Sequence, residues 1–196
     1  MNWRIVWLCV FAACFYGVVH DQVTVRISPE YFIVGHPPYF PTSNPTLLAL
    51  CWGVAGTWWV GAAFGFVLSL LLNHADGPRL IDRALTTRFV RLFIATAVAA
   101  VIAGFVGYKL SQRGIVSLPG TSELSDRHRF AAAWFAHVAS YIVGVTGSVV
   151  VVLRIWREQG SRRVLAFYPA TTAGAIRVVC LAITVLALIY WRAGGG

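Results

Sequence analysis

Long apolar stretches, separated by short polar segments rich in arginine, proline or glycine, make up most of the chain. A membrane-spanning helix needs about 20 predominantly apolar residues, and a stretch of that length predicts one. Such stretches cover residues 3–19, 46–73, 89–110, 130–153 and 174–191. The pattern therefore predicts an all-α fold, a polytopic membrane bundle of five helices formed by residues 1–196 as a single domain.

The composition also indicates a protein that is surrounded by lipid. Of the 196 residues, 58% are hydrophobic and only 12% are charged, whereas a soluble domain carries about 25% charged residues. The lipid bilayer is therefore the predicted partner. The net charge of +9 would suggest nucleic acid in a soluble protein. Here no basic face interleaved with aromatic residues is visible, so nucleic-acid binding is not expected.

The basic residues also indicate an orientation. Most of the 16 lysines and arginines flank those ends of the predicted helices that share a side with the amino terminus. Positive charge favours the cytoplasmic side, which predicts an amino terminus inside and a carboxyl terminus outside. The first apolar stretch continues past Cys14 and lacks a small-residue cleavage site, so it is interpreted as an uncleaved signal anchor.

All four cysteines lie inside apolar stretches and are expected to pack as small apolar side chains: Cys9, Cys14, Cys51 and Cys180. A disulfide between Cys14 and Cys51 near the outer surface is the alternative. Gly61 and Gly65 form a GxxxG pair, a spacing that lets two helix backbones approach closely. This face predicts contact within the bundle, or else a homodimer or docking onto a larger membrane complex.

The segment 20–45 is predicted to be an ordered outer loop with unusual chemistry. Its VTVRI stretch alternates like a strand, and its prolines prevent a continuing helix. The second outer loop, 111–129, adds a histidine on the same side. Together the loops allow two interpretations. One is a transition-metal site for zinc, copper, iron or manganese, with Asp21 supporting the ligands. The candidate ligands are His20, Glu30, His36 and His128.

The other interpretation, a purely structural role, is favoured by the sequence, because Arg26, Arg127 and Arg129 can neutralise Asp21 and Glu30 without a metal. His20 and Asp21 would then cap the end of the first helix, and Glu30 would pair with Arg26 or Arg127.

His137 belongs to a separate, intramembrane feature. With Ser140 and Tyr141 it forms a polar stripe on one helix face. His128 precedes it by about 900° of helical turn, so the two imidazoles are expected on opposite faces. An ionisable group within a span suggests function: a proton path, a haem ligand, or a hydrogen bond to Tyr16 or a backbone carbonyl. Haem is not expected, because no other predicted span carries a histidine.

Several motifs together give the chain a family resemblance. YGVVHDQVTVRISPEYFIVGHP (16–37) and PTLLALCWGVAGTWWVG (45–61) are followed by DRH (126–128) and HVASY (137–141). This set resembles a family of uncharacterised bacterial multi-pass membrane proteins. In that family a threonine follows EYF, where this chain has Ile33. The resemblance implies a location in the bacterial inner membrane and directs attention to the histidines and acids of these motifs; it implies no activity.

Three functions remain open. The chain contains no Walker loop, GxGxxG, GxSxG or HExxH motif. The first hypothesis is a non-enzymatic membrane protein, an accessory subunit of a larger complex. The second is a metal-dependent membrane enzyme or metal-handling protein that uses the outer His/Glu cluster. The third is a small transporter.

Overall fold

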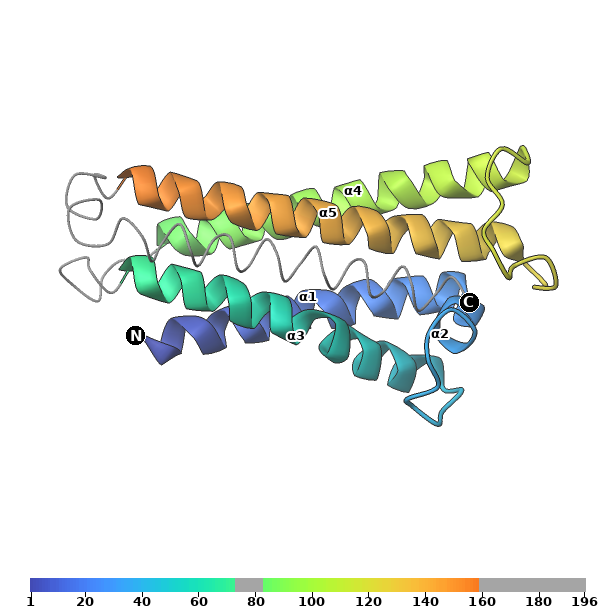
Figure 1. Ribbon diagram of the computed structural model, residues 1–196, viewed down its shortest axis with the longest axis horizontal. Helices are drawn as coiled ribbons and strands as arrows, with labels where there is room; N and C mark the ends of the chain where they lie inside the picture. The colour runs from blue at the N-terminus through green and yellow to red at the C-terminus, as the bar shows by residue number, and fades with distance from the viewer. Residues whose placement is uncertain (73–82, 159–196) are drawn as a thin grey trace.

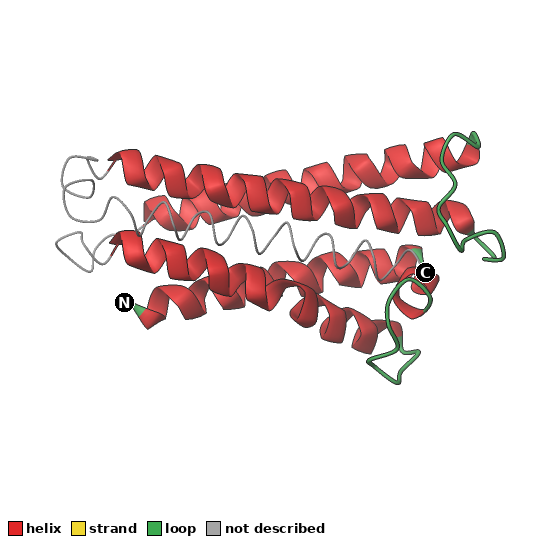
Figure 2. Cartoon of the chain, viewed as in Figure 1, coloured by secondary structure: helices red, strands yellow, loops and turns green. Residues whose placement is uncertain are grey.

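The computed structural model describes residues 1–72 and 83–158, and within these ranges the chain is helical, with no strand (Figure 2). Four helices are long, between 25 and 32 residues, and a fifth is a single short turn. In chain order they are α1 (Trp3–Ile27), α2 (Pro29–Ile33), α3 (Pro45–Leu72), α4 (Arg83–Gln112) and α5 (Arg127–Glu158). The fifth predicted span, 174–191, lies outside the described residues.

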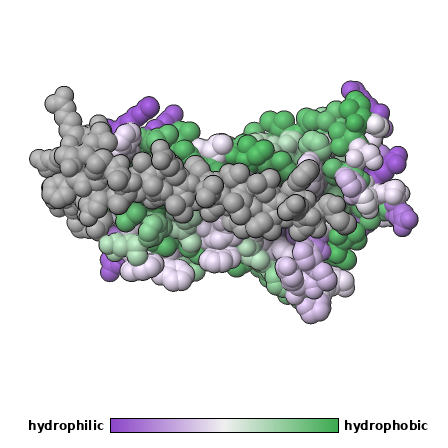
Figure 3. Space-filling model, in the orientation of Figure 1, coloured by the Kyte–Doolittle hydropathy of each residue, from purple (hydrophilic) through white to green (hydrophobic). Residues whose placement is uncertain are grey.

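The long helices are each apolar and long enough to cross a membrane. At 1.5 Å per residue, the shortest is about 38 Å long, which exceeds the hydrocarbon thickness of about 30 Å. Their outward faces carry large apolar side chains, such as Phe15 at 71% exposure and Val101 at 73%. Figure 3 shows green, hydrophobic residues along the bundle and purple, hydrophilic residues toward its ends. The chain is a membrane helix bundle.

The first helix is two turns longer than its apolar stretch predicted. It includes the VTVRI stretch, which is helical rather than strand-like, and ends at Ile27. Ser28 then accepts a hydrogen bond from the backbone N–H of Tyr31, and Pro29 opens α2, where a missing N–H costs nothing. The predicted outer loop therefore begins at residue 28 rather than 20, and His20 and Asp21 lie in a transmembrane helix.

The helices associate as two antiparallel pairs, α1 with α3 and α4 with α5 (Figure 1). Gly61 and Gly65 of α3 face α1: a Cβ on Gly61 would lie 2.6 Å from the carbonyl oxygen of Cys9, and one on Gly65 2.8 Å from Cα of Val6. The GxxxG face is thus used inside the chain. Cys9, Cys14 and Cys51 are free thiols, so the alternative Cys14–Cys51 disulfide is not formed.

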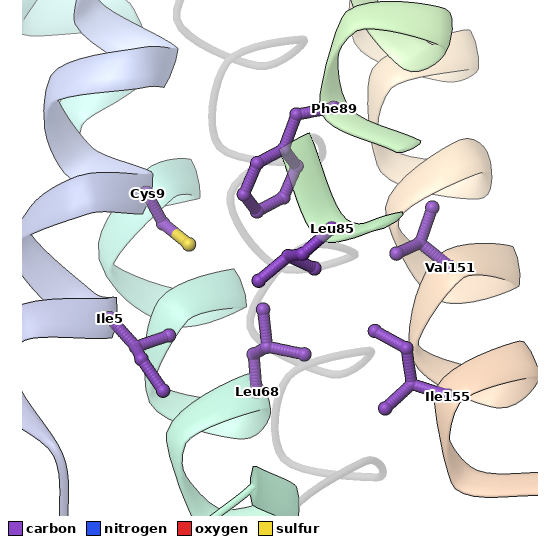
Figure 4. Close-up of a cluster of buried hydrophobic side chains, with 7 residues drawn as sticks. All are labelled: Ile5, Cys9, Leu68, Leu85, Phe89, Val151 and Ile155. Atoms are coloured by element: carbon purple, nitrogen blue, oxygen red, sulfur yellow. The ribbon is translucent and has the colours of Figure 1, made fainter. Parts of the chain in front are cut away.

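Two apolar clusters join the pairs, one at each end of the bundle. Figure 4 shows the cluster near the amino terminus, to which all four long helices contribute: Ile5, Cys9, Leu68, Leu85, Phe89, Val151 and Ile155. The other lies at the α2 end and contains Val25, Tyr31, Phe32, Leu48, Ala49, Phe130 and Ala133. The candidate site lies between these two clusters.

Candidate metal centre

A histidine and an aspartate that are neighbours in α1 face a histidine of α5. Asp21 Oδ1 lies 3.1 Å from His137 Nε2, and the His20 and His137 rings have centroids 4.6 Å apart. One donor atom from each of these three residues lies within 4.8 Å of the others. Adjacent positions on a helix are about 100° apart, so two long side chains can converge on one point in front of the helix.

Two of the three residues are buried, and His20 is half-buried. Asp21 is 6% exposed and His137 is 7% exposed. Ionisable groups in the interior of a membrane bundle are rare and are paired with one another, with backbone carbonyls or with an ion. Because Asp21 is buried, its carboxylate requires a partner, and His137 lies next to it.

Hydrogen bonding fixes which nitrogen of His137 carries a proton. His137 Nδ1 lies 2.8 Å from the carbonyl oxygen of Ala133. A carbonyl can only accept, so Nδ1 donates, and in the neutral ring Nε2 is then a lone pair. A lone pair cannot approach a carboxylate oxygen at 3.1 Å unless something positive lies between them. The contact needs a proton on one partner or a cation bound to both.

His20 supplies the third polar atom of the cluster, and this atom makes no hydrogen bond. Its Nε2 is buried and has no hydrogen-bond partner among the described residues. A buried polar atom without a partner costs about 1–3 kcal/mol, and in native proteins such atoms call for a water, an ion or a functional role. The free Nε2 of His20 lies beside the same contact that requires a positive charge.

The structure does not bring the four predicted ligands together, and groups only His20 of that set with Asp21 and His137. Glu30 accepts hydrogen bonds from Ser28 (3.2 Å) and Ser125 (2.9 Å) rather than pairing with an arginine. His128 Nδ1 lies 3.0 Å from Ser111 Oγ at the end of α4. The extra turns of α1 are the physical reason, because they carry His20 and Asp21 to the depth of His137 and leave the others nearer the surface.

Residues 28–44, which we call the roof, cover the cluster. The ring of Tyr31 lies 4.4 Å and that of Phe32 5.6 Å from the His137 ring, centroid to centroid. His36 Nδ1 lies 2.8 Å from the carbonyl oxygen of Tyr31, and its ring lies 4.4 Å from that of Trp52. Aromatic rings thus separate the cluster from the end of the bundle.

Two titratable side chains of the roof have shifted pKa values. Burial is the main cause that lowers the pKa of His36 to about 4, and nearby His137 adds to it, while the hydrogen bond to Tyr31 acts in the opposite direction. His36 is therefore neutral at pH 7. A hydrogen bond from its own backbone lowers the pKa of Glu30, helped by the hydroxyls of Ser125 and Ser28, so this side chain is an anion.

On the side away from the roof, the cluster borders a cavity of about 100 Å³ between the two helix pairs. The predicted polar stripe of α5 lines it, with His137, Ser140 and Tyr141 in successive turns. Of the two partners predicted for His137, the backbone carbonyl is the one observed. Tyr16, the other, instead shares a hydrogen bond of 2.7 Å with Ser140 Oγ. The cavity also reaches Gly144, where an added Cβ would meet nothing within 4 Å.

The site could not be assembled from sequence spacing, because Asp21 and His137 are 116 residues apart. One local signal was available. Ser28-Pro29 is a strong pattern for the start of a helix, so α1 could have been extended to Ile27. That extension would have placed a second histidine within a span, at the depth of the first.

The chain is a membrane helix bundle that brings two histidines and an aspartate together beside an internal cavity. Comparisons with protein-family models, curated proteins and solved structures find no match. The function must therefore be argued from the geometry of the cluster and the cavity.

Proposed function

We propose that this protein is an integral membrane metalloprotein that binds one divalent transition-metal ion through His20, Asp21 and His137. The observation that carries the proposal is the convergence of three donor atoms within 4.8 Å, of which two, Asp21 Oδ1 and His137 Nε2, are 3.1 Å apart. Two ligands of a tetrahedral zinc ion, each about 2.0–2.1 Å from the metal, lie about 3.3 Å from each other. The observed contact is close to that length.

The surroundings support this assignment. The Nδ1–H of His137 donates to a backbone carbonyl, the usual device that orients a metal-binding imidazole and leaves Nε2 for the metal. The unpartnered Nε2 of His20 provides the second imidazole. Two imidazoles and one carboxylate suit zinc or ferrous iron, and three protein ligands are typical of catalytic rather than structural sites.

Three protein ligands leave a coordination position open toward the cavity. A metal in such a site lowers the pKa of a bound water to about 7 or polarises a substrate oxygen. We therefore favour a metal-dependent membrane enzyme over a non-enzymatic accessory subunit. Nothing among the described residues favours a transporter over these two.

Assembly with other membrane proteins would need a face other than the GxxxG pair, since Gly61 and Gly65 pack against α1. The charge distribution supports a cytoplasmic amino terminus, and thereby an outer roof and an outer-leaflet position for the metal. A bacterial inner membrane is part of the same proposal and rests on the motif resemblance.

Metal content of the purified protein tests the proposal. Protein isolated without chelator should contain about one zinc or iron per chain by elemental analysis. Variants His20→Ala, Asp21→Asn and His137→Ala should lose it. Asp21→Asn is the sharpest of the three, because the amide can still donate to His137 Nε2 and keep the helices together.

Two other histidines serve as matched controls. His36→Ala and His128→Ala remove imidazoles near the same end of the bundle that do not belong to the cluster, and both should retain the metal. Folded wild-type protein without metal, or equal loss in the control variants, would contradict the assignment.

A further inference from the structure

The cavity beside the cluster is long and follows the helix axes. It extends along α1 from Asp21 to Cys9, and along α5 from His137 to Ser148. Eleven residues of helix span about 16 Å. The cluster lies at one end of this passage, and Phe89 and Cys9 of the apolar cluster near the amino terminus line the other. The cavity thus has the proportions of a narrow chain rather than of a compact molecule.

The lining becomes apolar with distance from the cluster. Phe64, Phe89 and Leu92 line the far part, whereas Phe93 stacks on Tyr16 nearer the cluster, at 5.5 Å between ring centroids. Three hydroxyl groups along the passage donate to backbone carbonyls of their own helices: Thr57 to Gly53 (2.6 Å), Thr96 to Leu92 (2.8 Å) and Ser148 to Gly144 (2.7 Å). Such a wall offers little to water, and apolar cavities of this kind stay dry or bind apolar molecules.

Side chains that hydrogen-bond to each other between helices line the passage near the cluster. Tyr16 and Ser140 hold each other at 2.7 Å next to His20 and His137. The passage therefore has one end suited to oxygen atoms and a remainder suited to methylene groups. In a membrane, the molecules with this distribution are lipids, which surround the protein at high concentration.

We propose that the ligand of the metal centre is a single-chain or acyl lipid, with an oxygen-bearing head at His20, Asp21 and His137 and its alkyl chain in the passage toward Cys9. The inference rests on the proposed metal function for its polar end, whereas the chain site rests on the cavity alone. The lipid head would then lie beside the roof-side third of α1, and its chain would extend toward the centre of the bundle. A lipid in one leaflet of a bilayer has the same orientation.

A photoreactive fatty acid with a diazirine near the end of its chain tests the proposal. Incorporated into membranes that contain the full-length protein, then irradiated, it should label cavity residues such as Cys9 and Leu92. It should also label lipid-facing residues such as Phe15, which provide the internal reference. Mass spectrometry of the peptides reports both sets.

Gly144→Leu is the blocking variant, because Gly144 lines the passage and a Cβ added there would have no neighbour within 4 Å. Labelling of cavity residues should fall by at least about tenfold, a change that corresponds to a modest loss of binding free energy. Labelling of lipid-facing residues should not change. Val150→Leu introduces the same residue on an outward position of the same helix and should behave as wild type.

Metal analysis of the same samples separates the two proposals. Cavity labelling in protein that never holds metal would support the chain site and overturn the metal function. Metal-loaded protein with unlabelled cavity residues, or with labelling indifferent to Gly144→Leu, would overturn the lipid inference and leave the metal function intact.

Discussion

His36 shows how one residue of the roof responds to its surroundings. Its ring contacts Tyr31, Phe32 and Trp52, and its Nδ1 donates to the backbone of Tyr31. Burial lowers its pKa from 6.5 to about 4, so the folded roof accommodates only the neutral imidazole. Protonation of His36 is therefore expected to open the roof rather than to create a new contact.

We predict that the roof loses stability as the pH falls from 6.5 toward 4. In this window the unfolded state binds a proton that the folded state does not, so stability is complete above pH 6.5. The loss is at most about 3 kcal/mol, since one pKa unit corresponds to about 1.4 kcal/mol. Hydrogen exchange of residues 28–44 as a function of pH measures it.

His36→Gln is the control, because it removes the titrating ring and keeps a polar side chain. Its exchange should be flat across the same window, while Glu30 destabilises both proteins only at lower pH, its pKa being below the usual 4.5. His137 is present in both proteins and cancels in the difference. An identical pH profile in the variant would assign the transition to another group.

The sequence identified most of the residues with unusual chemistry but not which of them contact one another. His20, Asp21 and His137 all stand out as ionisable groups in an apolar chain. Which of them meet depends on the rotation and depth of two helices that are far apart in sequence. No local pattern encodes that relation, so His36 and His128 were equally plausible partners for His20.

The pairing of α1 and α3 depends on glycines, which have no side chain. Gly53 allows the backbone of Val18 to approach so closely that a Cβ would lie 2.6 Å from its Cα, and Gly61 does the same near Val10, at 2.7 Å. Without a hydrophobic driving force between helices in lipid, this close dispersion contact is what holds the pair together.

We predict that Gly61→Leu separates α1 from α3. Four added carbon atoms would press on the backbone of Cys9 and Val10, which cannot move aside as a side chain could. Overpacking of this kind costs about 1–3 kcal/mol or more, and the melting temperature in mild detergent should fall accordingly. Gly144→Leu, the same exchange where an added Cβ would meet no protein atom within 4 Å, should lower it far less. Equal melting of both variants would contradict this account.

Hydrophobic patterns predicted the presence and order of the elements better than their ends. Apolar stretches located the four described spans, because lipid imposes a minimum length on each. They placed the end of α1 too early, since the polar residues after position 19 suggested a loop. Those residues remain helical because His20 and Asp21 face the interior and Val19 and Val23 face outward, at 49% and 58% exposure.

For the whole molecule, the arrangement in Figure 1 separates two ends of different character. The roof and the segment between α4 and α5 lie at one end, and the start of α1 and the end of α5 lie at the other. Ser43 is exposed at the first end and Arg157 at the second. Only the distribution of basic residues says which end faces the cytoplasm.

We predict that a cysteine at Ser43 reacts with a membrane-impermeant thiol reagent in intact cells, in a background without the native cysteines. A cysteine at Arg157 should react only after lysis, because the positive charges around it mark the cytoplasmic side. Mass-tagging of the two variants measures the difference. The reverse pattern would invert the protein and place the roof and the cluster on the cytoplasmic side.

The ligands of the proposed centre come from the first long helix and from the last one described. During synthesis, His20 and Asp21 enter the membrane long before His137 is made, 116 residues after Asp21. Until then the carboxylate of Asp21 lacks the partner that its burial requires. The α1–α3 hairpin is therefore complete only after the α4–α5 hairpin docks against it. The order of the helices in the sequence thus sets the order in which the bundle assembles.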